Sequence, residues 1–297
     1  MVKSFSLQNK MNIQKYNQRT EKVNSLVCVG LDSDFAKIQQ KFFDMEYPQF
    51  EFNKYIIDET NEFVSAYKPN TAFYEARGDQ GIKELKMTMD YLNEKYPDIF
   101  TILDAKRADI GNTNNGYATF AFDWLGADAV TLHPYLGREA LAPFLDRKDK
   151  TSIILCKTSN SGSAELQDLQ IFSHCALPEV SGGTLADKKF TSPEVKFVYE
   201  FVAEKVSNEW NENKNCMLVV GATYPEEMKK IREITGDMTF LVPGIGAQGG
   251  DLEAVIKNGM NADKKGLIIS SSRGIIFSEN PKLEAKKLRD EMIKYQG

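Results

Sequence analysis

The chain has 297 residues, of which 42% are hydrophobic and 27% are charged, and its formal net charge at pH 7 is −5. This composition is typical of a globular protein, and the acidic balance gives no reason to expect nucleic acid as a partner. Local groups, rather than the overall charge, must therefore bind any anionic ligand.

The compartment is predicted from the terminal segment and the cysteines. Residues 1–20 are polar and lack the apolar core of a signal peptide, and Asp or Glu interrupts each long apolar stretch, so no membrane span is predicted. Cys28, Cys156 and Cys216 each lie in or beside an apolar run, and no CxxC pair occurs. Buried reduced thiols and a cytoplasmic location are the expected reading.

Short apolar runs alternate with longer amphipathic segments almost to the end of the chain. Eight of these runs are predicted strands: Leu26–Leu31, Phe63–Lys68, Phe100–Asp104, Ala129–His133, Ser152–Lys157, Met217–Gly221, Thr239–Pro243 and Leu267–Ser271. Between them, Lys83–Lys95 and Pro225–Thr235 carry apolar residues at helical spacing. Eight such repeats favour a closed (β/α)8 TIM barrel over an open doubly wound sheet.

The same pattern predicts the domain organisation. Nothing suggests a second domain, so we expect residues 1–297 to form a single barrel domain with roughly the first 20 residues as an extension. The longest interruption, Ser159–Ser192, follows the fifth strand and is rich in Ser and Gly. It is too long for a routine connection, which predicts an active-site cover or a mobile excursion.

The most informative motif is Asp104-Ala-Lys106-Arg-Ala-Asp109, at the end of the third predicted strand. Period-two alternation would put Asp104 and Lys106 on one face, with Asp109 in the following loop. Holding a cation among carboxylates near a strand end costs desolvation and couples their protonation. The alternative is a structural ion network, but a strand end of a barrel is where catalytic groups lie, which favours a functional site.

Other predicted strand ends supply further candidates. They carry Asp32, Lys68, His133, residues 157–159, Gln248 and Arg273. Asp32 could instead be a capping or turn residue, and Lys68 a surface lysine whose stem lies along the barrel wall.

The segment from Pro243 to Gly250 matches the GxGxxG pattern of dinucleotide sites. Fewer than 50 residues follow it, which is too few for a dinucleotide-binding sheet. We expect Gly244 and Gly246 instead to let backbone N–H groups approach a phosphate beside Arg273, since barrels often bind phosphate after strands seven and eight. A simple glycine turn is the alternative.

Two other chemistries are disfavoured by the sequence. His133 and His174 are the only histidines, and neither is spaced with carboxylates as a metal pair would be. Ser161-Gly-Ser163 lacks a nucleophile elbow and an evident His–Asp partner set. We therefore predict no metal site and no serine hydrolase.

Taken together, these residues resemble the orotidine 5′-monophosphate decarboxylase family. Residues 104–113 look like its DxKxxDIGxT signature, and further support comes from Gly30–Asp32, Lys68–Asn70, Lys157–Ser159, Pro243–Gln248 and Arg273. The long stretch after the fifth strand looks like the family's longer-looped branch. The resemblance implies cofactor-free decarboxylation of orotidine 5′-monophosphate (OMP) to UMP, the last step of UMP synthesis.

The resemblance also implies residue roles. The catalytic array would be Lys68, Asp104, Lys106 and Asp109, with Lys106 as proton donor to C6 of the pyrimidine. Substrate contacts would come from Asp32, Asn70, Thr113, Ser159, Pro243, Gly244, Gln248 and Arg273: Asp32 and Thr113 at the ribose, Ser159 at the pyrimidine edge, and Gln248 with Arg273 at the phosphate. Asp109 and Thr113 would reach into the neighbouring subunit's site, which implies a homodimer.

Two alternatives remain open at this point. One is a sugar-phosphate lyase or aldolase on a similar barrel, in which Asp104 and Asp109 would hold Mg²⁺. The other is a non-catalytic nucleotide-binding scaffold, although such a protein has no physical reason to keep so costly a charge cluster. Following OMP absorbance with and without EDTA would separate the three.

Overall fold

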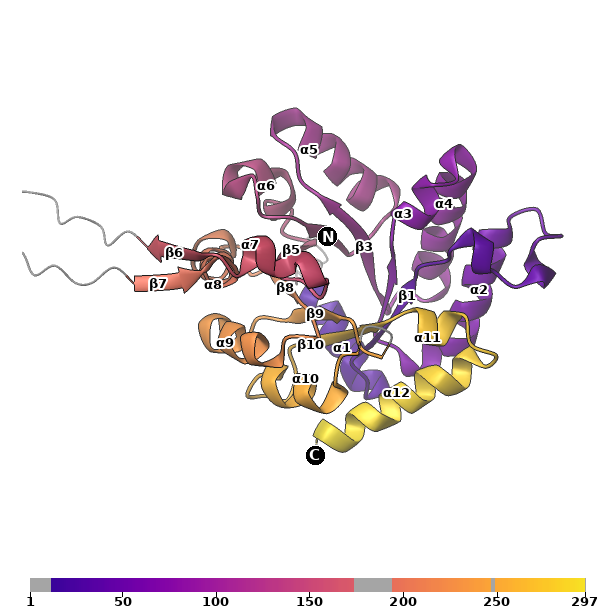
Figure 1. Cartoon of the computed structure of the whole chain (residues 1–297). Helices are drawn as coiled ribbons and strands as arrows, with labels where there is room; N and C mark the ends of the chain where they lie inside the picture. The colour runs from indigo at the N-terminus through magenta and orange to yellow at the C-terminus, as the bar shows by residue number, and fades with distance from the viewer. Residues whose placement is uncertain (1–11, 174–193, 247–248, 297) are drawn as a thin grey trace, which may run out of the picture.

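Eight parallel strands close into a barrel in a computed structural model that describes residues 12–173, 194–246 and 249–296 (Figure 1). The strands are β1 (Val27–Leu31), β2 (Ala66–Pro69), β3 (Phe100–Arg107), β4 (Ala129–Leu132), β5 (Thr151–Lys157), β8 (Cys216–Val220), β9 (Phe240–Pro243) and β10 (Leu267–Ser271). Each neighbours the next, and β10 pairs with β1 to close the ring. The predicted (β/α)8 barrel and its eight strands are confirmed, with small shifts at the strand ends.

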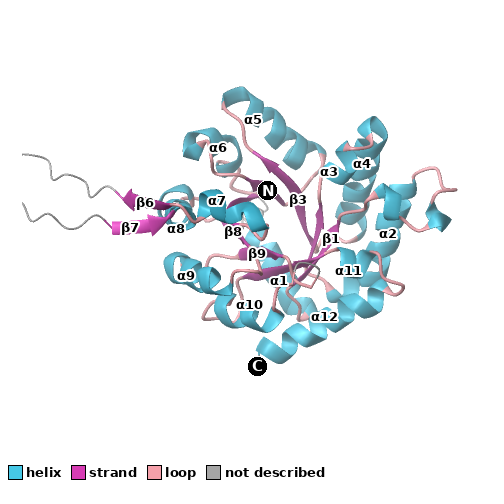
Figure 2. Ribbon diagram, viewed as in Figure 1, coloured by secondary structure: helices cyan, strands magenta, loops and turns pink. Residues whose placement is uncertain are grey.

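Helices cover the outside of the barrel (Figure 2). The α-helices are α1 (Asn12–Val23), α2 (Pro48–Thr60), α3 (Ala72–Glu75), α4 (Gly78–Lys95), α5 (Gly111–Ala118), α6 (Gly137–Leu145), α7 (Ala164–Gln167), α8 (Val198–Lys205), α9 (Pro225–Thr235), α10 (Leu252–Gly259), α11 (Arg273–Ile276) and α12 (Pro281–Gln296). Short 3-10 helices are η1 (Phe35–Lys37), η2 (Gln40–Phe42), η3 (Asn61–Phe63) and η5 (Ser161–Ser163), and two π-helical segments, η4 (Thr119–Trp124) and η7 (Val206–Trp210), follow α5 and α8. The two predicted helices correspond to α4 and α9. Across the described residues, no helix has the length and apolar character needed to cross a bilayer.

Alternation along the strands divides the buried residues into two cores. Inward-facing side chains such as Phe100, Ile102 and Ile153 fill the barrel interior, while outward-facing ones pack against the helices. Cys28 lies in the interior core, and Cys156 and Cys216 lie in the outer one. All three are buried free thiols, as predicted. The fourth cysteine, Cys175, is outside the described residues.

Helix α1 packs against the amino ends of the strands. The Tyr16 side chain belongs to the interior core, and its hydroxyl donates to the Leu267 carbonyl at 2.6 Å. Arg19 is buried and donates to the carbonyls of Val64 (3.1 Å) and Asn61, and to Asp98 (2.8 Å). Residues 12–20 of the segment expected to be an extension therefore lie in this helix.

The longest departure from the βα repeat follows β5. It begins with η5 and α7 and continues into β6 (Gln170–Ser173), which pairs antiparallel with β7 (Glu194–Phe197). This two-stranded ribbon projects beyond the ring of helices (Figure 1). Residues 174–193 are outside the described residues; they include His174 and the remainder of the predicted Ser159–Ser192 insertion.

Arg19→Ala should lower the free energy of unfolding by about 2–4 kcal/mol, because the backbone carbonyls of Asn61, in η3, and Val64, just before β2, would lose their hydrogen-bond donor. Lys22→Ala is the matched control: Lys22 binds the same Asp98 at 2.7 Å but its side chain is 64% exposed, so its loss should cost less than about 1 kcal/mol. Urea unfolding at neutral pH measures both, and equal losses would contradict the role given to Arg19.

Candidate active site

A cavity of about 470 Å³ lies at the carboxyl ends of the barrel strands. Most of the predicted site residues line it: Asp32, Lys68, Asn70, Asp104, Lys106, Ser159, Pro243, Gly244 and Arg273. They come from loops and strand ends far apart in the sequence, and barrel closure brings them to one opening. This is the end of the barrel at which catalytic groups were predicted.

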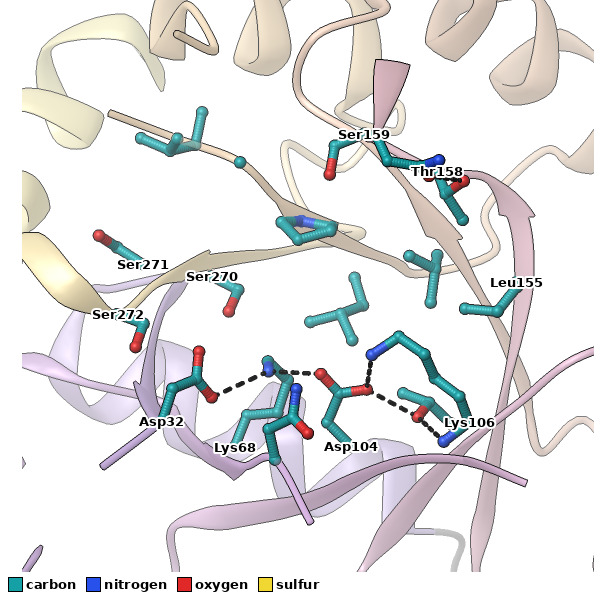
Figure 3. A pocket seen from close by; sticks show the side chains of 18 of the residues that line it. Asp32, Lys68, Asp104, Lys106, Leu155, Thr158, Ser159, Ser270, Ser271 and Ser272 are labelled. Atoms are coloured by element: carbon teal, nitrogen blue, oxygen red, sulfur yellow. Dashed lines mark hydrogen bonds and ion pairs between the residues drawn. The ribbon is translucent and has the colours of Figure 1, made fainter. Parts of the chain in front are cut away.

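Four charged side chains form a row along one wall of this cavity (Figure 3). Lys68 Nζ lies 2.8 Å from Asp104 Oδ2 and 3.8 Å from Asp32 Oδ1, and Lys106 Nζ lies 2.7 Å from Asp104 Oδ1. Asp104 follows Ile102 by two residues and Lys68 follows Ala66 by two, so each stands one step above the apolar interior core. The carboxylate of Asp104 is thus bound on both oxygens by ammonium groups.

The protonation of this row follows from burial and charge. Burial by itself would raise the pKa of Asp104, but Lys68 and Lys106 outweigh it and hold that pKa well below its usual range. Burial would lower the pKa of Lys68, yet Asp104 and Asp32 hold it above its usual range. Cys28 lies beneath them, and burial raises the pKa of its thiol to about 12. The Asp104–Lys68 pair is therefore ionised near neutral pH, and Cys28 stays a thiol.

Lys106 reaches the cavity through an irregular backbone. The pairing of β3 with β4 shifts between Leu103 and Arg107, and Lys106 has φ +47°, a left-handed conformation that is rare for a lysine. Its side chain folds back toward Asp104 (Figure 3). Asp104 and Lys106 do share the cavity as predicted, but a bulge rather than plain alternation brings them together.

The turn after β9 and the start of α11 form a second edge of the cavity. Gly244 and Gly246 have φ of +104° and +74°, so both use conformations that glycine adopts without strain. Arg273, the first residue of α11, lines the cavity, and its guanidinium makes no hydrogen bond or ion pair with the described residues. This edge can accept an anion. Gln248, predicted to act here, is outside the described residues.

A third edge is the start of the long segment after β5. Thr158, Ser159, Asn160 and Gln167 line the cavity there. The Thr158 backbone N–H donates to Gln167 Oε1 at 2.9 Å, and Gln167 Nε2 donates to Thr158 Oγ1 at 2.8 Å. In Figure 3, Thr158 and Ser159 lie across the cavity from Asp32 and Lys68. The predicted pyrimidine-contacting serine is therefore on a braced segment facing the charged row.

Lys157 points away from this cavity. A second register shift, between Leu155 and Lys157 in the pairing of β5 with β8, interrupts the alternation at that point. The fully buried ammonium group donates to Asp168 and lies 4.3 Å from the centre of the Tyr224 ring. Lys157 thus anchors the segment after α7 rather than the charged row.

Two predicted residues do not line the cavity of their own chain. Asp109 lies in the loop between β3 and α5, where its Oδ1 accepts the Ile110 N–H at 2.7 Å, and Thr113 is exposed on α5. His133, a strand-end candidate, is also absent from the lining and lies 3.2 Å from the Ala108 carbonyl oxygen. Within one chain, the row therefore consists of Asp32, Lys68, Asp104 and Lys106.

Several lining residues were missed by the sequence analysis. They are Thr131, Leu155, Val219, Leu241 and Ser270. Val219 and Leu241 belong to the interior core, and Thr131, Leu155 and Ser270 each follow one of its members by two residues. Thr131 Oγ1 donates to Asp104 Oδ1 at 2.9 Å and accepts the Lys106 backbone N–H at 2.9 Å. Period-two alternation along the strands predicts these inward-facing positions. Choosing the last polar residue of each predicted strand indicates His133 instead of Thr131.

The fold and this cavity together define a barrel enzyme with a lysine–aspartate–lysine row at the carboxyl ends of its strands. The chain belongs to the Orotidine 5′-phosphate decarboxylase / HUMPS family, whose profile matches residues 25–288.

Individual relatives agree with this assignment. The chain is 44% identical over 270 residues to an orotidine 5′-phosphate decarboxylase of Cellvibrio japonicus, covering 90% of each. It is 44% identical over 286 residues to one of Flavobacterium johnsoniae, covering 96% of each. The solved structure of Leishmania donovani OMP decarboxylase is 36% identical, with a TM-score of 0.79 over 97% of this chain and 99% of that one.

Asp104→Asn should lower the free energy of unfolding at pH 7 by about 3 kcal/mol, because it leaves two lysines facing each other without their shared anion. The folded-state pKa of Asp104 is depressed, so its contribution is complete above the unfolded-state pKa of about 4 and declines as the pH falls below it. The difference in the free energy of unfolding between wild type and Asp104→Asn should stay constant from about pH 6 to 8 and become smaller below about pH 4.

Asp34→Asn is the control for this prediction, because Asp34 pairs with Lys37 at 2.6 Å on an exposed turn. Its loss should change stability by less than about 1 kcal/mol. Denaturant titrations across the pH range measure the free energy of unfolding of wild type and both variants. If the difference between wild type and Asp104→Asn grew as the pH fell below about 4, the depressed pKa of Asp104 would be contradicted.

Proposed function

We propose that this protein decarboxylates OMP to UMP, the last step of UMP synthesis, and that the Lys68–Asp104–Lys106 row carries the reaction. The observation that supports this most directly is the Asp104 carboxylate, held ionised between two lysines at the mouth of the barrel. The relatives at 44% identity carry the name of this activity. Family membership and site chemistry thus lead to the same reaction.

The proposed step is the heterolytic cleavage of one carbon–carbon bond. The bond between C6 and the carboxylate breaks, CO₂ departs, and the electron pair stays on C6. Asp104 lies against the substrate carboxylate and disfavours it before the reaction, while Lys106 stabilises the negative charge that forms on C6. Lys106 Nζ then transfers a proton to C6, and solvent returns a proton to the amine.

Residues on the other edges of the cavity make the remaining contacts with the substrate. Arg273 and the Gly244 turn bind the 5′-phosphate, with Gln248 beside them, and Pro243 packs against the substrate. Ser159 binds the pyrimidine edge, and Asn70 lies beside Lys68. Asp32 binds ribose hydroxyls: its Oδ1 is buried and has no hydrogen-bond partner in the described part of the chain, so a substrate hydroxyl would satisfy it.

The same geometry supports a magnesium-dependent lyase less well than a decarboxylase. A divalent cation on Asp104 would have to displace Lys68 from Oδ2, and Lys106 with Thr131 from Oδ1. Two ammonium groups within 3 Å of the carboxylate also repel a cation electrostatically. The occupied carboxylate therefore supports charge stabilisation by lysine rather than by a metal on Asp104.

We further propose a homodimer in which Asp109 and Thr113 complete the partner's site. Neither residue lines the cavity of its own chain, yet both belong to the motif that carries Asp104 and Lys106. The surface beside them is apolar: Ile110 is 62% exposed and Tyr135 85% exposed. Because the loops after β3 and β4 meet where His133 contacts Ala108, these two side chains offer one surface for a second copy of the chain.

Lys106→Ala should reduce turnover of OMP by at least about 1,000-fold, because it removes both the cation facing C6 and the proton donor. UMP should still bind, since the phosphate and ribose contacts remain. Loss of OMP absorbance measures turnover, and calorimetry measures UMP binding.

The exposed-lysine variant Lys22→Ala is the control and should match wild type. EDTA should leave the wild-type rate unchanged. A Lys106→Ala protein that keeps more than about a tenth of the activity would refute the proton-donor assignment, as removing a general acid costs far more. A wild-type protein without activity on OMP would refute the function itself.

Mixing inactive Lys106→Ala and Asp109→Ala proteins should restore activity. Random exchange of subunits makes half of the dimers hybrid, and each hybrid carries one intact site, so about a quarter of wild-type activity should return. If Asp109 served the site of its own chain, no hybrid site would be intact and the mixture would stay inactive. The recovered rate after subunit exchange is the measurement.

A further inference from the structure

We propose that Thr131 is a positioning residue that holds Asp104 and Lys106 in their reactive arrangement; this rests on the proposed decarboxylation. Thr131 lies on β4, 1% exposed, and its side chain lines the cavity. It belongs neither to the DxKxxD motif nor to the strand-end candidates found from the sequence. Its importance comes from where the pairing of β3 with β4 breaks.

The first step of the argument is the register of that pairing. Leu103 pairs with Val130 and Arg107 pairs with Leu132, so Asp104, Ala105 and Lys106 stand opposite the single residue Thr131. A bulge of this size leaves backbone groups without their usual partners on the neighbouring strand. Thr131, on β4 opposite the bulge, bonds both Asp104 and Lys106.

The second step is the hydrogen bonding of the Thr131 hydroxyl. Its oxygen accepts the backbone N–H of Lys106 at 2.9 Å, which satisfies the donor that the bulge removed from the ladder. Its single proton goes to Asp104 Oδ1, also at 2.9 Å. One hydroxyl therefore connects the backbone of the proposed proton donor to the carboxylate that orients its ammonium group.

The third step is the conformation that this bond holds. Lys106 has φ +47°, which an L-residue with a long side chain adopts only when its surroundings require it. Fixing the N–H at this φ turns the lysine stem back over the strand end, where Nζ meets the same Asp104 Oδ1 at 2.7 Å. Thr131, the Lys106 backbone, the Lys106 ammonium group and Asp104 thus form a closed ring of contacts.

This ring predicts a specific kinetic signature. The proposed phosphate and ribose contacts come from the turn after β9, from α11 and from the loop after β1, none of which Thr131 bonds. Loss of the hydroxyl should therefore leave substrate binding intact and lower the chemical step. A threonine that merely filled the core would change stability without separating kcat from KM.

The test compares Thr131→Val, which keeps the shape and removes the hydroxyl, with Thr131→Ser, which keeps the hydroxyl. Thr131→Val should lower kcat by about 10- to 100-fold while KM for OMP and the affinity for UMP change less than about threefold. Thr131→Ser should retain at least about a third of the wild-type kcat. Thr131→Ala answers the same question should the valine variant not fold.

Thr151→Val is the matched control. Thr151 is equally buried, at the opposite end of the neighbouring strand β5, and its hydroxyl has no hydrogen-bond partner among the described residues. This variant should keep the wild-type kcat. The proposal is overturned if Thr131→Val keeps more than about half of the wild-type kcat, or if Thr131→Ser falls as far as Thr131→Val. An inactive wild-type protein would instead refute the proposed function, so the two failures are distinguishable.

Discussion

The Asp104 carboxylate, bound by lysines on both oxygens, is the interaction on which the rest of the site depends. A buried carboxylate is stable only if its lost hydration is replaced, and Lys68, Lys106 and Thr131 together replace it. These partners come from β2, β3 and β4, three adjacent strands of the barrel. Closure of the barrel therefore does more than bury apolar surface: it holds three donors at fixed distances around one anion.

The cavity is asymmetric in a way that suits the proposed chemistry. The charged row occupies one wall, the apolar side chains of Leu155, Val219 and Leu241 line the cavity where it meets the interior core, and Arg273 also lines it. Apolar walls lower the local dielectric and strengthen the interaction of the row with charge that develops on a substrate. A remote anion contact can then supply binding energy without touching the reacting atoms.

Two of the barrel strands depart from regular pairing, and both do so at this cavity. The bulge in β3 turns Lys106 inward to Asp104, whereas the shift at the end of β5 accompanies Lys157 turning outward to Asp168. Bulges re-aim side chains that strict alternation would send elsewhere. One strand thereby places a second charged side chain in the cavity, and the other gains an anchor for the segment that carries Ser159 and Gln167.

The sequence alone determined the strand–helix repeat, the buried thiols and the charged residues at the cavity, because apolar periodicity and short motifs are local properties of the chain. It placed Asp104 and Lys106 together, but by alternation, since nothing local reveals a bulge or a left-handed lysine. Thr131 was overlooked because its value lies in facing two residues of a different strand. Only the tertiary structure decided which groups converge on the cavity, and that Lys106 rather than Lys157 turns toward it. Strand register and barrel closure depend on contacts between residues distant in sequence, so no local pattern encodes them.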